Sequence, residues 1–246
     1  MIMKHTFIAS CLLGLLCWSC SSSPKQETST RPGHDYYVAA FIWPSCHDDS
    51  LGHAHLWPQG HGEWEVIQKG NPRFEGHYQP KQPLWGYEHD DDPRVVERWI
   101  DTALEYGVNT FIYDWYWFMD YPYLEGALND GFLKARNNEQ MNFYIMWANH
   151  VVAKNYWNYH LHGDDTSVLF DPKVNWDQFK TIVARVINQY FTRPNYVKID
   201  GCPVFGVFDI NQFIQSFGST DEAAKAMAYF RDEVIKAGFK GLHVQE

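Results

Sequence analysis

Short apolar runs alternate with longer amphipathic stretches from residue 37 to the end of the chain. Runs of this length, rich in aromatic and β-branched residues, are typical of strands buried on both faces of a parallel sheet. The predicted strands are Tyr37–Trp43, Asn109–Tyr113, Asn142–Trp147, Pro203–Phe208 and Leu242–Gln245.

Amphipathic helices are predicted between these strands. One helix has Asp92 as its N-cap, Pro93 at its first position and Gly107 at its end, which are the residue types favoured there. The other predicted helices cover 123–137, which glycines interrupt, 175–191 and 220–238.

The alternation of strand and helix predicts an α/β fold of the (β/α)8 TIM-barrel type. No glycine-rich phosphate turn follows the first strand, which disfavours a dinucleotide-binding fold. A complete barrel has eight strands, and residues 36–246 supply about the first five βα units. We therefore expect a partial barrel in an apparently truncated chain, with its site at the carboxyl ends of the strands.

The first residues predict a targeting segment. Lys4 and His5 precede an apolar stretch, 7–16, that is too short to span a membrane. Ser19 and Cys20, followed by a Ser/Thr-rich tail, are similar to a bacterial lipoprotein signal. We expect 1–20 to be a signal peptide, Cys20 to carry a lipid anchor in the membrane, and 21–35 to be a flexible tether. The expected location is the cell envelope, on its periplasmic face or outer surface; secretion is the alternative if Cys20 is not lipidated.

The remaining cysteines, Cys46 and Cys202, form neither a disulfide framework nor a paired-cysteine metal motif. One disulfide between them is possible in an oxidising compartment, and the sequence leaves that open.

Composition narrows the class of ligand. Aromatic residues make up 17% of the chain, a density that suits either an aromatic core or the flat faces of sugar rings. The net charge is −10 and no cluster of lysine or arginine occurs, which disfavours nucleic acid as a partner.

Three motifs occur in order: GHGEWEVIQKGNPRFEGHYQP at 60–80, YGVNTFIYDWYWF at 106–118 and WAN at 147–149. Together they resemble the glycoside hydrolase family 99-like domains, including WbsX-type glycosyltransferases. The resemblance implies a barrel acting on glycans, without metal or cofactor, and a founding activity of endo-cleavage of α-mannosides with retention. It also implies two working carboxylates in a late motif resembling Asn-Glu-Trp-x-Glu-Gly, which this sequence lacks. Relatives often have glutamate after WAN, where this chain has His150.

Asp114 is the candidate catalytic residue, because tryptophan neighbours could raise its pKa toward that of a general acid. The alternative is that it accepts hydrogen bonds from substrate hydroxyls or a loop N–H. Glu63 matches the family glutamate and is expected to bind substrate or hold its loop. The other expected substrate contacts, with packing at the barrel rim as the alternative for the aromatic rings Tyr116, Trp117 and Trp147, are His77, Tyr78, Tyr116, Trp117, Trp147, Asn149 and His150.

Histidines and carboxylates are dense between 46 and 65, which is a composition that metal sites share. His53 and His55 could supply two ligands, but the segment follows no ordered metal-site spacing. We therefore expect an exposed loop there and no metal.

Three functions are compatible with these features. The first is hydrolysis of a complex glycan, of α-mannoside type or related, at the cell envelope. The second is non-catalytic glycan binding, since the expected carboxylate pair is absent. The third, glycosyl transfer in surface-polysaccharide assembly, is disfavoured by a lipoprotein signal because nucleotide sugars are cytoplasmic. Whether this chain is an active enzyme stays open.

Overall fold

The computed structural model describes residues 36–246 of the chain. Its main sheet contains parallel strands that pair in chain order, each beside the parallel strand that precedes it. These strands are β1 (Ala39–Ile42), β2 (Thr110–Phe118), β4 (Asn142–Trp147), β8 (Cys202–Val207) and β9 (His243–Gln245). Sequential order is that of a (β/α) barrel, whereas a doubly wound sheet reverses direction at a switch point. The predicted α/β fold of barrel type, with five βα units, is confirmed.

Short strands extend the ends of this sheet and form a second one. β3 (Tyr121–Tyr123) pairs antiparallel with the end of β2, and β7 (Lys198–Ile199) pairs antiparallel with β8. β5 (Val152–Ala153) and β6 (Val168–Phe170) form a separate antiparallel pair. None of these four strands is predicted by the apolar pattern, because each is three residues or fewer.

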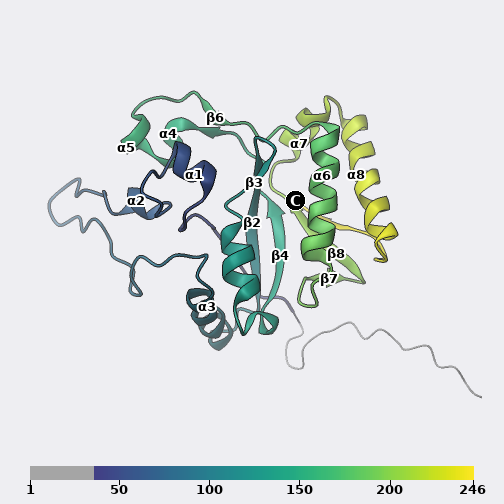
Figure 1. The fold of residues 1–246 in the computed structure, drawn as a ribbon, viewed down its shortest axis with the longest axis horizontal. Coiled ribbons are helices and arrows are strands. Elements are labelled where there is room, and N and C mark those ends of the chain that lie inside the picture. Colours follow the sequence, from purple (N-terminus) through teal and green to yellow (C-terminus); the bar gives the residue numbers. More distant parts are fainter. Residues whose placement is uncertain (1–35) are drawn as a thin grey trace, which may run out of the picture.

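Helices between the main strands pack against the sheet in one large apolar cluster. In Figure 1, α6 and α8 lie to the right of β4, and α3 lies at the lower left. The helices are α1 (Ser50–His55), α2 (Trp64–Ile67), α3 (Pro93–Glu105), α4 (Lys154–Trp157), α5 (Tyr159–His162), α6 (Trp176–Val186), α7 (Ile210–Phe217) and α8 (Thr220–Lys236). Shorter turns are η1 (Ala127–Gly131), η2 (Phe132–Lys134), η3 (Asn138–Gln140) and η4 (Ile187–Phe191).

Side-chain caps define where the helices begin. Asp92 accepts a hydrogen bond from the backbone N–H of Arg94 at the start of α3, as predicted. Asn175 and Gln178 form a capping box at the start of α6, which continues through η4 to the predicted end at Phe191. α7 is not predicted, although Asp209 caps it in the same way.

The predicted end of the second strand is wrong. The strand does not stop at Tyr113 but runs to Phe118 and turns back into β3 through Met119 and Asp120, which both have positive φ angles. Two positive φ values are typical of the tight turns in β-hairpins, which usually contain glycine or asparagine. The residues at this turn, Met119 and Asp120, are neither glycine nor asparagine, so the sequence does not reveal the hairpin.

The segment 123–137 is not the α-helix that its pattern predicts. It forms the π-helical turn η1 and the 3₁₀ turn η2. Gly131 packs so closely on the backbone oxygen of Asp90 that a Cβ there would lie 2.1 Å from it. This close approach requires glycine and favours an irregular helix.

Loops after the strands form a second apolar cluster at the upper left of Figure 1. It joins α1 and α4 with the β2–β3 hairpin and the β5–β6 pair, and Trp57, Tyr123 and Trp157 are among its members. This cluster covers the carboxyl ends of β1, β2 and β4, where the candidate site lies.

Cys46 and Cys202 are both free, so the disulfide considered between them is not formed. The predicted signal peptide, tether and lipidation site at Cys20 lie outside the described residues. Within the described part of the chain, no helix combines the length and apolarity that a membrane crossing needs.

Candidate functional site

Strand alternation divides the side chains of β2 between two environments. Tyr113, Trp115 and Trp117 belong to the apolar cluster shared with the helices, whereas Asp114 and Tyr116 line a cavity. Successive residues of a strand point to opposite faces of the sheet, which accounts for this division. Asp114 is in register with Met146 of β4, and Met146 with Gly206 of β8.

The cavity has a volume of about 420 Å³, within the range of small-molecule sites. It lies at the carboxyl ends of β1, β2, β4 and β8, which is where barrel proteins place their ligands. Its lining combines aromatic rings with two carboxyl groups and contains no lysine or arginine. The lining residues are Trp43, Glu63, Asp114, Tyr116, Met146, Ala148, His150, Tyr156, Trp157 and Phe208.

Asp114 is a carboxyl group without a partner. Its Oδ1 is buried and accepts no hydrogen bond from the described residues. Burial removes water from the charged form and raises the pKa of Asp114 to about 6. Asp114 therefore keeps its proton to a higher pH than an ordinary carboxyl group, and about half of the molecules are protonated near pH 6.

Tyr116 places a second unpartnered group in the cavity. The residue is fully buried, and its hydroxyl has no hydrogen-bond partner in the described part of the chain. Burial, followed by the negative charges of Asp114 and Glu63, raises the pKa of Tyr116. The hydroxyl therefore stays neutral and can donate a hydrogen bond to a ligand.

Glu63 enters the cavity from the loop between α1 and α2. Its Oε2 accepts hydrogen bonds from Trp43 Nε1 at 2.6 Å and from Ser45 Oγ at 2.8 Å. The backbone N–H of Glu63 also donates to the carbonyl oxygen of Ser45, at 2.8 Å. Gly62 makes this contact possible, because it has a φ of +60° and a Cβ there would lie 2.0 Å from the Ser45 oxygen.

Aromatic rings form the walls of the cavity and meet edge to face. The ring centroid of Trp43 lies 5.8 Å from that of Tyr116 and 5.4 Å from that of Trp157. His150 packs edge-on against Tyr116, Trp157 and Phe208. Such pairs are worth about 0.5–1.5 kcal/mol beyond area burial, so the walls support one another.

The structure brings four of the predicted site residues together, namely Glu63, Asp114, Tyr116 and His150. Sequence reasoning missed the wall residues Trp43, Tyr156, Trp157 and Phe208. Trp43 carried a usable signal, since it is the last residue of the first predicted strand. Tyr156 and Trp157 carried none, because α4 is only four residues long.

Trp117 and Trp147 lie elsewhere than predicted. Both are buried in the cluster under the helices, and Trp147 packs against Phe179 and Phe213. The expected position of these rings at the rim is therefore wrong, because they point away from the cavity. They contribute to the core.

Asn149, His77 and Tyr78 do not line the cavity. Asn149 donates to the backbone oxygen of Asp209 and accepts from its N–H, which ties the ends of β4 and β8 together. His77 stacks on Phe74, and Tyr78 is 65% exposed on the loop before α3. Substrate contact by these three residues stays a prediction.

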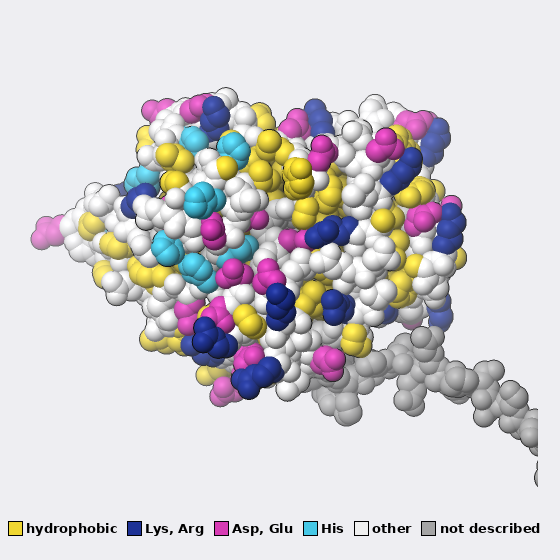
Figure 2. Space-filling model, in the orientation of Figure 1, with side chains coloured by type: hydrophobic (Ala, Val, Ile, Leu, Met, Phe, Trp, Pro, Cys, Tyr) yellow, Lys and Arg dark blue, Asp and Glu magenta, His cyan; other side chains and the backbone are white. Residues whose placement is uncertain are grey.

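Histidines gather over α1, α2 and α5 with acidic side chains among them, as Figure 2 shows. His61 Nδ1 lies 3.1 Å from His89 Nε2, and His53 Nδ1 lies 2.9 Å from Asp48 Oδ1. No group of three or more metal-ligating side chains occurs among residues 36–246. The expected exposed loop over 46–65 is wrong in part, because α1 and the start of α2 lie within this segment. His53 and His61 are exposed, but His47 is buried and bonded to Asp90 at 2.6 Å.

Two solved structures align with part of this chain. The GH99 endo-alpha-mannosidase from Bacteroides thetaiotaomicron is 11% identical, with a TM-score of 0.42 over 75% of this chain and 50% of that chain. The structure described as that enzyme in complex with bis-tris-propane is 12% identical, with a TM-score of 0.39, over 75% and 47% of the respective chains.

Curated relatives are longer than this chain. Uncharacterized protein WxcX of Xanthomonas campestris pv. campestris, strain B100, is 28% identical over 172 residues, which cover 70% of this chain. The same figures hold for WxcX of strain ATCC 33913. The chain spans about a quarter of the length of these relatives, 24% in each case.

The model of the family described as Glycosyltransferase WbsX matches residues 38–246, which include all the strands of the sheet and the whole cavity lining. The chain therefore belongs to the Glycosyltransferase WbsX family.

Proposed function

We propose that the cavity binds a sugar residue of a neutral complex glycan and that the protein hydrolyses a glycosidic bond there. The observation that carries this proposal is the unpartnered carboxyl of Asp114 in an aromatic-walled cavity. Sugar rings present apolar faces that stack on aromatic rings, and hydroxyls that need hydrogen-bond partners. Asp114 and Tyr116 offer such partners, and a lining without lysine or arginine favours a neutral sugar over an acidic one.

Asp114 supplies the acid chemistry in this proposal. Hydrolysis of a glycosidic bond needs a carboxylic acid that protonates the leaving oxygen, and a second carboxylate. A pKa of about 6 lets Asp114 carry the proton in mildly acidic solution, and in a minority of molecules at neutral pH. The rate should therefore fall as the pH rises above about 6, because the acid loses its proton.

The test measures reducing ends released from a panel of α-linked glycans, mannosides included, by the full chain. Asp114→Asn should lower the rate by about 100-fold, the lower end of the contribution of general acid catalysis. Asp232→Asn is the matched control, because Asp232 is exposed on α8, far from the strand ends in sequence and structure. Hydrolysis that is unchanged in Asp114→Asn would remove Asp114 from the mechanism.

Non-catalytic glycan binding is the second candidate, and the hydrogen bonds that Glu63 already makes favour it. Glu63 is the other carboxyl group of the cavity, and its Oε2 already accepts two hydrogen bonds. Binding of a panel glycan without any release of product would support this candidate. A requirement for a nucleotide sugar in the same assay would instead support glycosyl transfer, the activity in the name of the family.

The proposed location is the cell envelope, with a lipid on Cys20. The motif that supports it is the apolar stretch followed by Ser19 and Cys20. Metabolic labelling of the full chain with a fatty-acid analogue in a bacterial host should mark the protein, and Cys20→Ser should abolish the label. Label that persists in the variant would assign the anchor to another residue.

A further inference from the structure

Trp43 is a partly exposed wall of the cavity. It follows β1, which lies at one edge of the described sheet, and 37% of its surface is exposed. Trp157, on the facing wall, is only 6% exposed and packs inside the apolar cluster of the loops. Trp43 contacts Tyr116 and Trp157 edge to face, and no ring stacks in parallel on its indole among the described residues.

One carboxylate oxygen of Glu63 restrains the indole of Trp43 through a hydrogen bond. Oε2 of Glu63 accepts from Trp43 Nε1 at 2.6 Å, a short distance that is typical of a hydrogen bond to an ionised acceptor. The same oxygen accepts from Ser45 Oγ, and the backbone of Glu63 is bonded to the backbone of Ser45. Glu63 thus makes three hydrogen bonds to this segment, one to Trp43 and two to Ser45.

The backbone around Glu63 is built for this arrangement. Gly62 brings the loop onto the Ser45 carbonyl, at a distance that no side chain at position 62 would allow. Glu65, in the next turn, accepts from the backbone N–H groups of Gln59 and His61 and closes the preceding loop. The loop therefore delivers one carboxylate to a fixed place beside the indole.

We propose that Glu63 is a positioning residue, which acts on the ligand through Trp43 by fixing the indole as a stacking wall for a sugar ring. This inference rests on the proposed binding of a sugar in the cavity. A wall that is fixed before the ligand arrives removes the entropy cost of ordering it during binding. Loss of Glu63 should therefore weaken binding and leave the chemical step nearly unchanged.

The first test follows the indole without any ligand. In the full-length protein the indole N–H resonance of Trp43, assigned with Trp43→Phe, should be protected from solvent exchange. Glu63→Ala should shift this resonance and raise its exchange rate at least tenfold, and Glu63→Gln should preserve the protection because its amide oxygen can accept the same bond. An unchanged resonance in Glu63→Ala overturns the inference, whatever the protein binds.

The second test uses α-linked mannotetraose as the probe, with its dissociation constant and its hydrolysis measured for each variant. Glu63→Ala should raise Kd or KM about tenfold at nearly constant kcat, and Glu63→Gln should stay within about twofold of the parent protein. Glu75→Ala is the matched control, because Glu75 is an exposed carboxylate outside the cavity lining; it should leave the Trp43 resonance and the dissociation constant unchanged.

A double-mutant cycle separates positioning from direct contact. If Glu63 acts through the indole N–H, Glu63→Ala should add little in the Trp43→Phe background, where that N–H is missing. Equal losses of kcat in Glu63→Ala and Glu63→Gln would identify Glu63 as a reacting carboxyl and overturn the positioning role. Absence of binding to any glycan, together with a Trp43 resonance that depends on Glu63, would refute the proposed function and the sugar-stacking role, and leave only the restraint on the indole.

Discussion

Asp114 is the residue whose environment departs most from that of an ordinary carboxylate. Its neighbours in the cavity are aromatic and apolar, and its Oδ1 has no partner among the described residues. Glu125, by contrast, is more buried yet accepts hydrogen bonds from Trp115, Asn129, Arg185 and Tyr190. Natural proteins satisfy buried polar groups, so an unsatisfied one in a cavity points to a ligand. The difference between the two acids separates a site residue from a structural one.

Asp114→Asn should raise the stability of the protein at neutral pH. Burial raises the pKa of Asp114 to about 6, above the value of about 3.9 expected in the unfolded chain. Between these two pKa values the native state binds more protons than the unfolded state. The free energy of unfolding therefore falls as the pH rises from about 4 to about 6. Asparagine does not titrate and avoids this loss, which is at most about 3 kcal/mol.

Urea unfolding of both proteins at several pH values checks this. The advantage of Asp114→Asn over the parent should grow between about pH 4 and pH 7, and the exposed variant Asp232→Asn should show no such trend. A stability difference that is flat with pH would show that Asp114 has an ordinary pKa.

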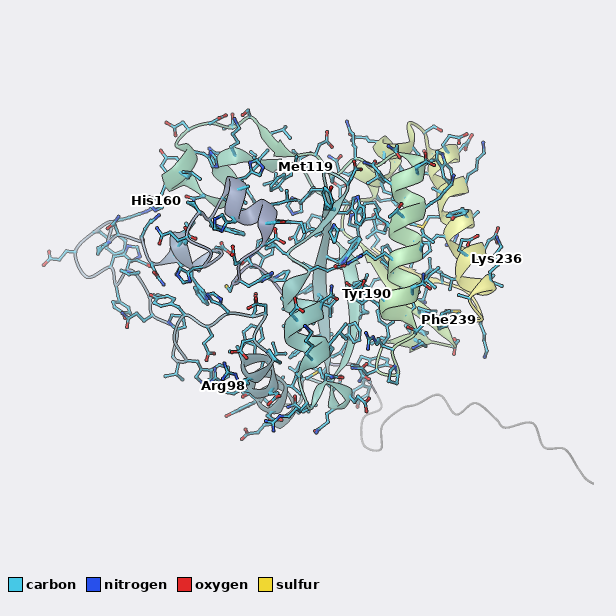
Figure 3. All side chains as sticks on the ribbon, viewed as in Figure 1. Arg98, Met119, His160, Tyr190, Lys236 and Phe239 are labelled. Carbon is cyan, nitrogen blue, oxygen red and sulfur yellow. The ribbon has the colours of Figure 1, made fainter. Side chains whose placement is uncertain are left out.

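At the scale of elements, one buried carboxylate joins β2, η1, α6 and η4. Trp115 donates to Glu125 from β2, Arg185 from α6, and Tyr190 from η4, where Figure 3 shows Tyr190 between the sheet and the helices. Burial alone would raise the pKa of Glu125, but the hydrogen bonds from Arg185, Tyr190 and Trp115 outweigh it and lower the pKa. The irregular η1 segment is therefore held by polar contacts as well as by packing.

Glu125→Gln should destabilise the protein by about 2–3 kcal/mol, because it leaves Arg185 without its counter-charge and disturbs several donors at once. Thermal unfolding of the variant gives the measurement. Lys134→Gln is the control, since its ion pair with Asp130 is exposed and contributes little. Equal melting temperatures for both variants would mean that apolar packing alone fixes η1.

At the scale of the whole molecule, a glycine lets two strands of the sheet pack closely beside a residue of the cavity lining, Met146. Gly206 of β8 lies beside Met146 of β4, and a Cβ at position 206 would lie 2.9 Å from the Met146 side chain and 3.0 Å from its Cα. A side chain there would have to displace Met146 or push the two strands apart. Because Met146 lines the cavity, Gly206 couples strand packing to the shape of the site.

Gly206→Ala should destabilise the protein by about 1–3 kcal/mol, the usual cost of overpacking a filled interior. It should also weaken binding of any glycan that the parent protein binds. Gly241→Ala is the control, because its Cβ would meet only the sulfur of Cys202 at 3.4 Å, an ordinary contact. Chemical denaturation compares the two, and tolerance of both substitutions would contradict the close strand contact.

The apolar pattern was sufficient for the main strands and for α3, α6 and α8, because these elements bury long, regular faces that leave a periodic trace. It failed for the hairpin at Met119 and for segment 123–137, whose shapes depend on contacts with distant parts of the chain. At the site, the sequence placed Asp114, Tyr116, Glu63 and His150 correctly in one cavity, through the strand ends and the family motifs. It could not distinguish Tyr116 from Trp117, because both faces of β2 are apolar.

The sequence by itself determined the class of fold, the order of the strands and the edge of the sheet where ligands bind, since these follow from local periodicity and from the geometry of parallel strands. Only the tertiary structure decided which rings face the cavity, that Asp114 has no partner, and that Glu63 is bonded to Trp43. Those facts depend on the register of β1, β2, β4 and β8 and on loops that meet across 20 or more residues. Such long-range contacts leave no periodic signal in a single sequence.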